Sequence, residues 1–116
     1  EADSLLAEAE RRAPEWAAPS LLRSAIAADR SLLRGRAGDR SREDLRVGIE
    51  HAERALATGD RAAALEWRGK LRFALARHAA PGAADTLMAA AERDLREAVR
   101  LEPGRAGALM TLSDLA

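Results

Sequence analysis

The chain has 116 residues, which suits a single small domain, and nineteen basic residues balance nineteen acidic ones. Acids and bases are interspersed along the sequence, which excludes the one-signed basic face of a nucleic-acid-binding protein. Cysteine is absent and no apolar run reaches the length of a membrane span, so disulfides, thiolate metal sites and membrane insertion are excluded.

Alanine, leucine, arginine and glutamate dominate the composition, and these residues form helices readily. β-branched residues are rare, which argues against a sheet. Most of the apolar share is alanine, which buries little area per residue. We therefore expect an all-α fold whose core depends on close contacts between helices.

Arginine supplies nearly all of the positive charge, since Lys70 is the only lysine. Codons for arginine and alanine are rich in G and C, which favours a bacterial source with a high-GC genome. The sequence begins at Glu1 without a methionine, so we expect it to belong to a longer protein. No signal peptide is visible. A cytoplasmic location is favoured, and a processed exported form stays open.

Apolar residues at three- and four-residue steps predict six helices, separated by proline or glycine. In chain order they cover residues 2–13, 19–34, 41–58, 61–79, 83–101 and 106–115. Ser41 and Asp60 are expected to cap the third and fourth helices. The stretch between the second and third helices is the most basic in the chain, with Arg34, Arg36, Arg40 and Arg42. We expect a solvated loop there, and a site for an anionic partner is the alternative.

Two of the helices end in one pattern of small and large residues. Its landmarks occur at the same spacing in two sets, which are Ala91, Leu95, Ala98 and Pro103, and Ala2, Leu6, Ala9 and Pro14. The pattern resembles the second helix of the tetratricopeptide repeat (TPR), which places a small residue, a large residue, an alanine and a proline in that order. The third helix matches it less well.

The first-helix half of the TPR motif, Trp-x-x-Leu-Gly-x-x-Tyr, is matched more loosely. Its partial matches are Leu109, Leu112 and Ser113, and, at a different spacing, Trp67 and Gly69. The helix stops at residues 14, 60 and 103 give a period roughly ten residues longer than the usual length of about 34. Long first helices and the loops between helices would account for the surplus.

The resemblance implies antiparallel helix pairs stacked as a right-handed solenoid. It also implies a scaffold without enzymatic activity that holds a peptide or partner protein in a concave groove, lined by the first helix of each pair. Transferred to this sequence, the candidate peptide-binding residues are Glu66, Lys70, Phe73 and Arg77 on the fourth helix, Leu21, Ala25 and Asp29 on the second, and Met110 and Asp114 on the sixth. An ordinary surface pair between Glu66 and Lys70 is the alternative for those two residues.

No catalytic motif is present. His51 and His78 are the only histidines and lack the spacing of metal ligands, and His51 is expected on a helix surface. We therefore expect no enzyme, no metal and no cofactor. Two alternatives stay open: a structural module that self-associates through exposed end helices, and an enzyme, which a deep polar pocket with converging ionisable groups would indicate.

Overall fold

The computed structural model describes residues 2–12, 22–23, 26 and 38–115. In this part of the chain it contains five α-helices and no strand, so the all-α prediction is confirmed there. The helices are α1 (Ala2–Arg12), α3 (Gly38–Thr58), α4 (Arg61–Ala76), α5 (Pro81–Leu101) and α6 (Ala106–Leu115). Most of the second predicted helix, residues 19–34, lies outside the described residues.

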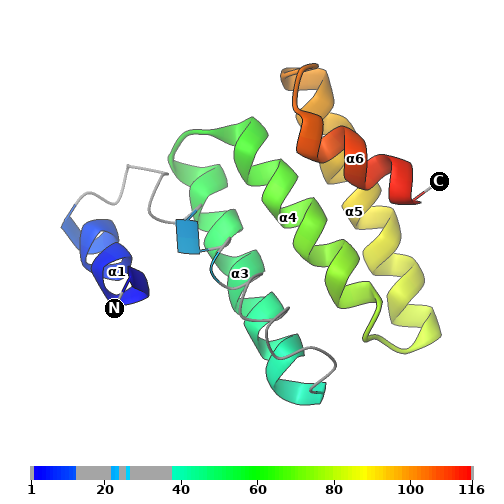
Figure 1. Ribbon diagram of the computed structural model, residues 1–116, viewed down its shortest axis with the longest axis horizontal. Coiled ribbons are helices and arrows are strands. Elements are labelled where there is room, and N and C mark those ends of the chain that lie inside the picture. Colours follow the sequence, from blue (N-terminus) through cyan, green and yellow to red (C-terminus); the bar gives the residue numbers. More distant parts are fainter. Residues whose placement is uncertain (1, 13–21, 24–25, 27–37, 116) are drawn as a thin grey trace.

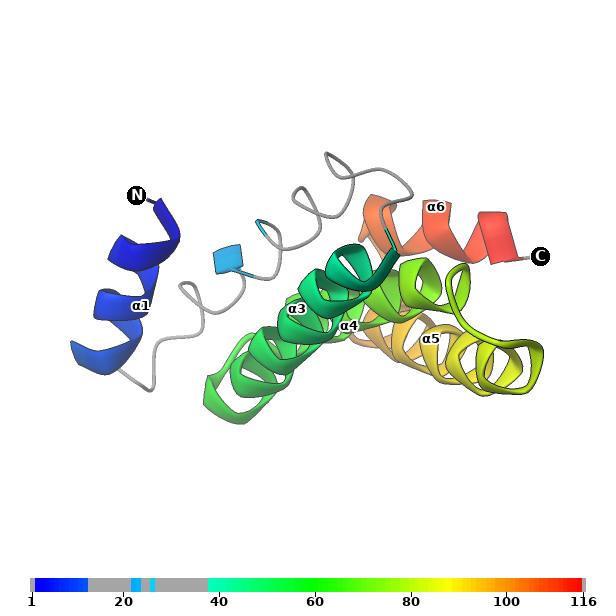
Figure 2. The same ribbon diagram turned by 90° about the horizontal axis from the view of Figure 1, so that it is seen from below.

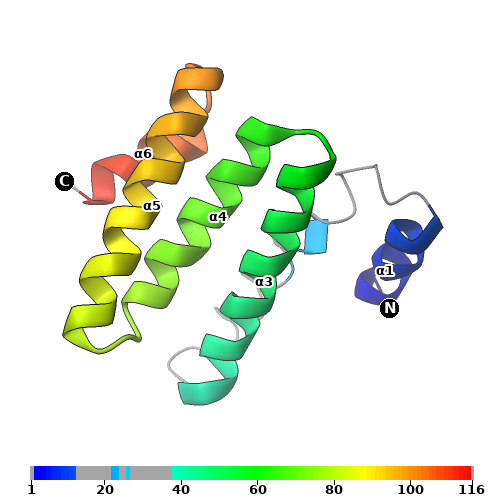
Figure 3. The ribbon, with the colours of Figure 1, turned by 180° about the vertical axis from the view of Figure 1, so that it is seen from behind.

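Three helices form the body of the molecule. In Figure 1, α3, α4 and α5 lie side by side in chain order, each antiparallel to its neighbour. Figure 3 shows the same layer from behind. α6 packs against one face of this layer and contacts α5 and α4, as Figure 2 shows from below. Among the described helices, α1 packs against none of the other four.

Capping residues, glycine and proline account for the helix ends, and three of these ends differ from the predicted residues: the start of α3, the end of α4 and the start of α5. Asp60 caps α4 as expected, and its Oδ1 accepts a hydrogen bond from the Ala63 backbone N at 3.2 Å. α3 begins at Gly38, so Ser41 lies inside the helix and the prediction that it caps the helix is wrong. A glycine is costly inside a helix but cheap at its first residue. The shift therefore adds a turn to α3.

The connection between α4 and α5 tightens before the proline. α4 ends at Ala76, three residues earlier than predicted, and the next backbone N–H groups bond to carbonyls only three residues back. α5 begins at Pro81 rather than at residue 83. Proline is favoured at the first helical residue because its missing N–H would have no partner there.

Small residues make up most of the core, as the composition predicts. Among the described residues, alanine accounts for nine of the fourteen buried hydrophobic residues, and the largest fully buried side chains are Leu45, Leu71 and Leu95. One cluster joins Leu65, Leu95 and Ala98 to Ala108 of α6. With so little side-chain volume, the helices must approach one another closely.

Gly69 marks such a close approach between α4 and α5. A Cβ atom at this position would lie 2.7 Å from Leu95 Cγ and 3.1 Å from the Ala91 carbonyl oxygen. Neither atom can give way easily, since Leu95 is fully buried and the carbonyl belongs to a helix backbone. Only glycine fits here without a shift of one helix.

His51 is 3% exposed, so the expectation that it lies on a helix surface is wrong. Leu45 and Ala52, two turns apart on α3, form a buried apolar stripe. Gly48, His51 and Ala55 form a second buried stripe beside it, at the same three- and four-residue spacing. Gly48 and Ala55, the other two residues of this second stripe, are small. The stripe therefore lacks the large apolar residues by which a buried helix face is predicted from sequence.

Candidate functional site

The side of α4 that the sequence singles out carries two cations, each above an aromatic ring. Lys70 Nζ lies 4.9 Å from the centroid of the Trp67 ring, and Arg77 Cζ lies 4.7 Å from that of Phe73. Both rings are partly exposed, and Arg77 is exposed. A cation above an aromatic face is attracted by the ring quadrupole. These contacts hold long side chains in defined positions on the helix surface.

Glu66 lies one turn before Lys70 and is 8% exposed. Its Oε2 lies 2.7 Å from Lys70 Nζ, and its Oε1 accepts a hydrogen bond from Arg105 Nε at 2.7 Å. Arg105 Nη1 also donates to Glu102 Oε1 at 2.9 Å. The pair between Glu66 and Lys70 is therefore present, but Glu66 is buried rather than on the surface, and the pair extends into a cluster that ties α4 to the connection between α5 and α6.

Burial of Glu66 on its own would raise the pKa of its carboxyl group. The hydrogen bonds from Lys70 and Arg105 and the charges of both outweigh burial, so the pKa of Glu66 lies below its ordinary value of 4.5. The same contact raises the pKa of Arg105, chiefly through its hydrogen bond to Glu66. Glu66 is therefore ionised and already occupied by two cations.

Gly107, the second residue of α6, lies directly over this cluster. A Cβ atom there would lie 2.5 Å from Glu66 Oε2 and 2.6 Å from Lys70 Nζ. The contact places the start of α6 against α4 at the position of the Glu66–Lys70 pair. α4 and α6 thus meet at a polar contact, while Ala108 of α6 is fully buried in the core on the α5 side.

Of the remaining predicted residues, the structure describes the two on α6 but not the three on the second predicted helix. Met110 and Asp114 are exposed on α6 and lie one and two turns after Gly107, so they share its side of the helix. Met110 is 70% exposed. Leu21, Ala25 and Asp29 lie outside the described residues. The structure therefore brings together the residues on α4 and places those on α6 along the adjoining helix.

A second charged cluster lies on the opposite side of α4, and the sequence analysis missed it. Asp94 of α5 is 5% exposed and accepts three hydrogen bonds: from Arg68 Nε at 3.0 Å, from Arg68 Nη2 at 2.8 Å and from Arg72 Nη1 at 2.7 Å. Glu53 of α3 lies 3.6 Å from Arg68 and 3.9 Å from Arg72. The cluster connects α3, α4 and α5.

One sequence signal points to this cluster. Asp94 falls on the same face as Ala91 and Ala98, so an acid interrupts a stripe that is otherwise apolar. A buried acid requires a partner, and Arg68 and Arg72 are one turn apart on the neighbouring helix. The hydrogen bonds that Arg68 donates to the Asp94 carboxylate raise the pKa of Arg68. With all its charges engaged, this cluster holds the three helices together.

Within the described ranges, no group of three histidine, aspartate or glutamate residues could hold a metal ion. None of the helices described combines the length and apolar character needed to cross a bilayer. What the α4 face offers is two cations, two aromatic rings and an adjoining helix with exposed side chains.

Comparison with protein-family models, with curated proteins and with solved structures finds no match for this chain.

Proposed function

We propose that this chain is a TPR-like protein-interaction module, in which helix pairs stack as a right-handed solenoid and a peptide or partner domain binds along the groove lined by α4 and α6. It acts as a scaffold without catalysing a reaction. Two kinds of observation support the proposal. The first concerns the repeat pattern and the second concerns the α4 face.

The residues that carry the TPR resemblance meet between α4 and α5. Gly69, a partial match to the first-helix motif at a different spacing, lies against Ala91 and Leu95, two landmarks of the second-helix motif. Ala98, the third landmark, is fully buried against Leu65. Contacts between these positions favour a helix pair of the TPR kind over an unrelated helical hairpin.

The observation that carries the function is the pair of cation–aromatic contacts on α4. The chain has only three aromatic residues, and two of them lie partly exposed on this helix with a cation above each ring. Aromatic and arginine side chains contribute most to binding at protein interfaces. Arg77 and Phe73 are therefore the expected contacts for a partner that combines acidic and apolar residues.

A peptide-display selection against the intact chain tests this proposal. We expect it to enrich acidic peptides that contain an apolar residue. The affinity of an enriched peptide, measured by fluorescence anisotropy, should fall about tenfold or more in Arg77→Glu and in Phe73→Ser. Arg96→Glu is the matched control, since Arg96 is an exposed arginine on α5. Equal affinity of the peptide for all three variants would show that it does not bind to the α4 face.

Self-association is the second candidate function, and exposed apolar side chains favour it. Leu5 of α1 is 71% exposed, and Leu109 and Met110 of α6 are 46% and 70% exposed. Apolar side chains exposed at both ends of a helical array are suited to contacts between copies. Sedimentation velocity over a range of concentrations should then show a dimer that Met110→Asp dissociates. A monomer at every concentration would exclude this function.

A further inference from the structure

A cavity lies where α3 begins and α4 turns into α5. Its volume is about 680 Å³, and its lining is Arg42, Glu43, Arg46, Leu75, His78, Ala79, Ala80, Ala83 and Leu87. It shares no lining residue with the peptide face of α4. An inference about this cavity is therefore independent of the proposed function.

The floor of the cavity is apolar and continuous with the core. Leu75 is buried together with Leu45 and Leu71, and Leu87 packs against this cluster. The alanines at positions 79, 80 and 83 add small apolar surface near the entrance. A floor of this kind favours an apolar group that leaves water.

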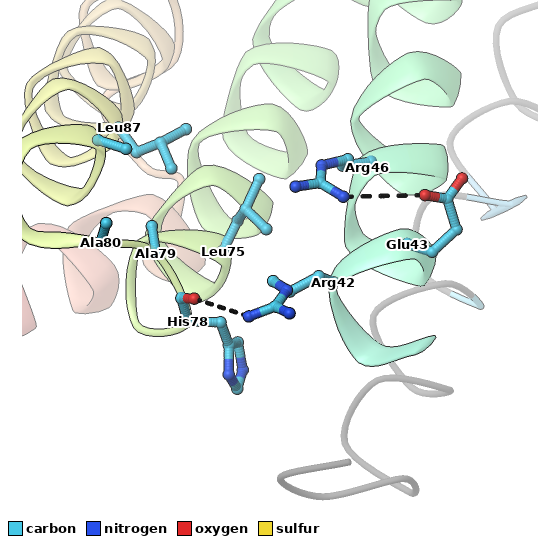
Figure 4. A pocket seen from close by; sticks show the side chains of 9 residues that line it. Arg42, Glu43, Arg46, Leu75, His78, Ala79, Ala80 and Leu87 are labelled. Atoms are coloured by element: carbon cyan, nitrogen blue, oxygen red, sulfur yellow. Dashed lines mark hydrogen bonds and ion pairs between the residues drawn. The ribbon is translucent and has the colours of Figure 1, made fainter. Parts of the chain in front are cut away.

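The rim of the cavity on the α3 side is cationic. Figure 4 shows Arg42 and Arg46 extending from α3 toward Leu75 and Ala79, and a dashed line joins Arg46 to the carboxylate of Glu43, which also lines the cavity. Arg42 Nη1 donates to the His78 carbonyl oxygen at 3.2 Å, which fixes this guanidinium at the rim. The contact between Arg46 and Glu43 is 3.9 Å long, and both side chains are more than half exposed. An ion pair of that kind is weak and yields readily to a better placed anion.

We propose that this cavity binds an apolar carboxylate, whose tail covers Leu75 and Leu87 while its carboxylate accepts hydrogen bonds from Arg46 and lies beside Arg42. A carboxylate matches the planar donors of a guanidinium better than a hydroxyl does. The first turn of α5, at Ala83, adds the positive end of a helix dipole to the same entrance. The ligand is thus either a medium-chain carboxylic acid or the apolar C-terminal residue of a peptide.

Calorimetric titration of the intact chain with sodium octanoate tests the proposal. Octan-1-ol has the tail without the charge, and acetate has the charge without the tail, so both should bind at least about tenfold more weakly than octanoate. NMR shifts of the octanoate complex should concentrate at Ala79, Ala83 and Leu87. A short peptide that ends in leucine separates the two sources, because the tighter ligand of the two identifies the natural one.

Two surface variants locate the site. Arg46→Gln removes the exposed cation and should weaken octanoate binding about three- to tenfold. Ala83→Trp fills the entrance and should weaken it about tenfold or more. Arg96→Gln, on the outer side of α5, is the control and should change nothing. Binding of octanol as tight as that of octanoate, or octanoate binding that survives both variants, would overturn the proposal, and so would the absence of octanoate binding.

Discussion

At the scale of single residues, Gly69 shows how little space separates α4 from α5. Gly69→Ala should lower the free energy of unfolding by about 1–3 kcal/mol, because the new methyl group collides with Leu95 and with the Ala91 carbonyl. The better helix propensity of alanine, worth about 1 kcal/mol, offsets only part of this cost. Urea unfolding followed by circular dichroism measures the change.

Gly82→Ala is the matched control for this substitution. Gly82 is also helical, and a Cβ atom there would meet nothing within 4 Å. We expect no loss of stability, and a gain of up to about 1 kcal/mol. If both alanine variants proved equally stable, the close approach of α4 and α5 would not exist in solution.

Asp94 joins two arginines of α4 to α5, so its substitution should lower the free energy of unfolding. Asp94→Ala leaves Arg68 and Arg72 without their main partner, and should destabilise the fold by about 2–4 kcal/mol. The two arginine side chains are 20% and 22% exposed, which keeps the cost below that of a fully buried pair. Chemical denaturation provides the measurement.

An exposed ion pair on the same helix calibrates that effect. Glu92 lies 3.2 Å from Arg96, and their side chains are 49% and 71% exposed. Glu92→Ala should therefore cost no more than about 0.5 kcal/mol. A comparable loss in both variants would mean that Asp94 contributes no more than a surface acid.

At the scale of helices, the N-termini of α4 and α5 differ in their capping residues. Asp60 caps α4, whereas Ala80 precedes α5 with extended backbone angles and no side-chain cap. Asp60→Ala should cost about 1 kcal/mol, and Ala80→Asp should add about 0.5–1 kcal/mol. Thermal unfolding of the two variants checks the opposite signs. A destabilised Ala80→Asp would show that the start of α5 cannot accept a cap.

The attachment of α6 to α4 should depend on pH through Glu66. Its pKa is lowered in the folded state, so its contribution is fully present above the ordinary value of 4.5 and is lost as pH falls through the lower folded value. Glu66→Gln should cost about 1–2 kcal/mol at neutral pH, since Lys70 and Arg105 keep some access to water. Unfolding measured from neutral to acidic pH should show this difference shrink below pH 4.5.

Glu92→Gln serves as the control, because its carboxylate is exposed on α5. Its stability should follow that of the unmodified protein across the same pH range. A difference between Glu66→Gln and the unmodified protein that stayed constant into acid would show that ionisation of Glu66 does not hold α6 in place.

Periodicity predicted the five helices that the structure describes, but not the contacts between them. The bounds of α6 agree with the prediction, and the cap at Asp60 was readable because capping is local. Asp94 and Arg68 are separated by 26 positions, and Glu66 and Arg105 by 39. No spacing rule within one helix links such residues, so both charged clusters emerge only when the helices are packed.

At the scale of the whole molecule, stability should reside in α3 to α6. α1 packs against none of these helices, and its Asp3 is joined to Arg23 by an ion pair of 3.0 Å. Deletion of residues 1–12 should therefore change the free energy of unfolding by less than about 0.5 kcal/mol. Urea unfolding of the truncated chain tests this, and a large loss would assign α1 to the same cooperative unit.

The close approach at Gly69 also decides where the molecule can bend. Helix backbones that nearly touch cannot slide or rotate past each other without collision, so α4 and α5 must move as one rigid body. α6 is attached to that body through Ala108, which is buried in the core, and through the polar contact between Glu66 and Arg105. If the proposed groove between α4 and α6 widens for a bulky ligand, α6 must therefore swing about residues 102–105 and expose Ala108.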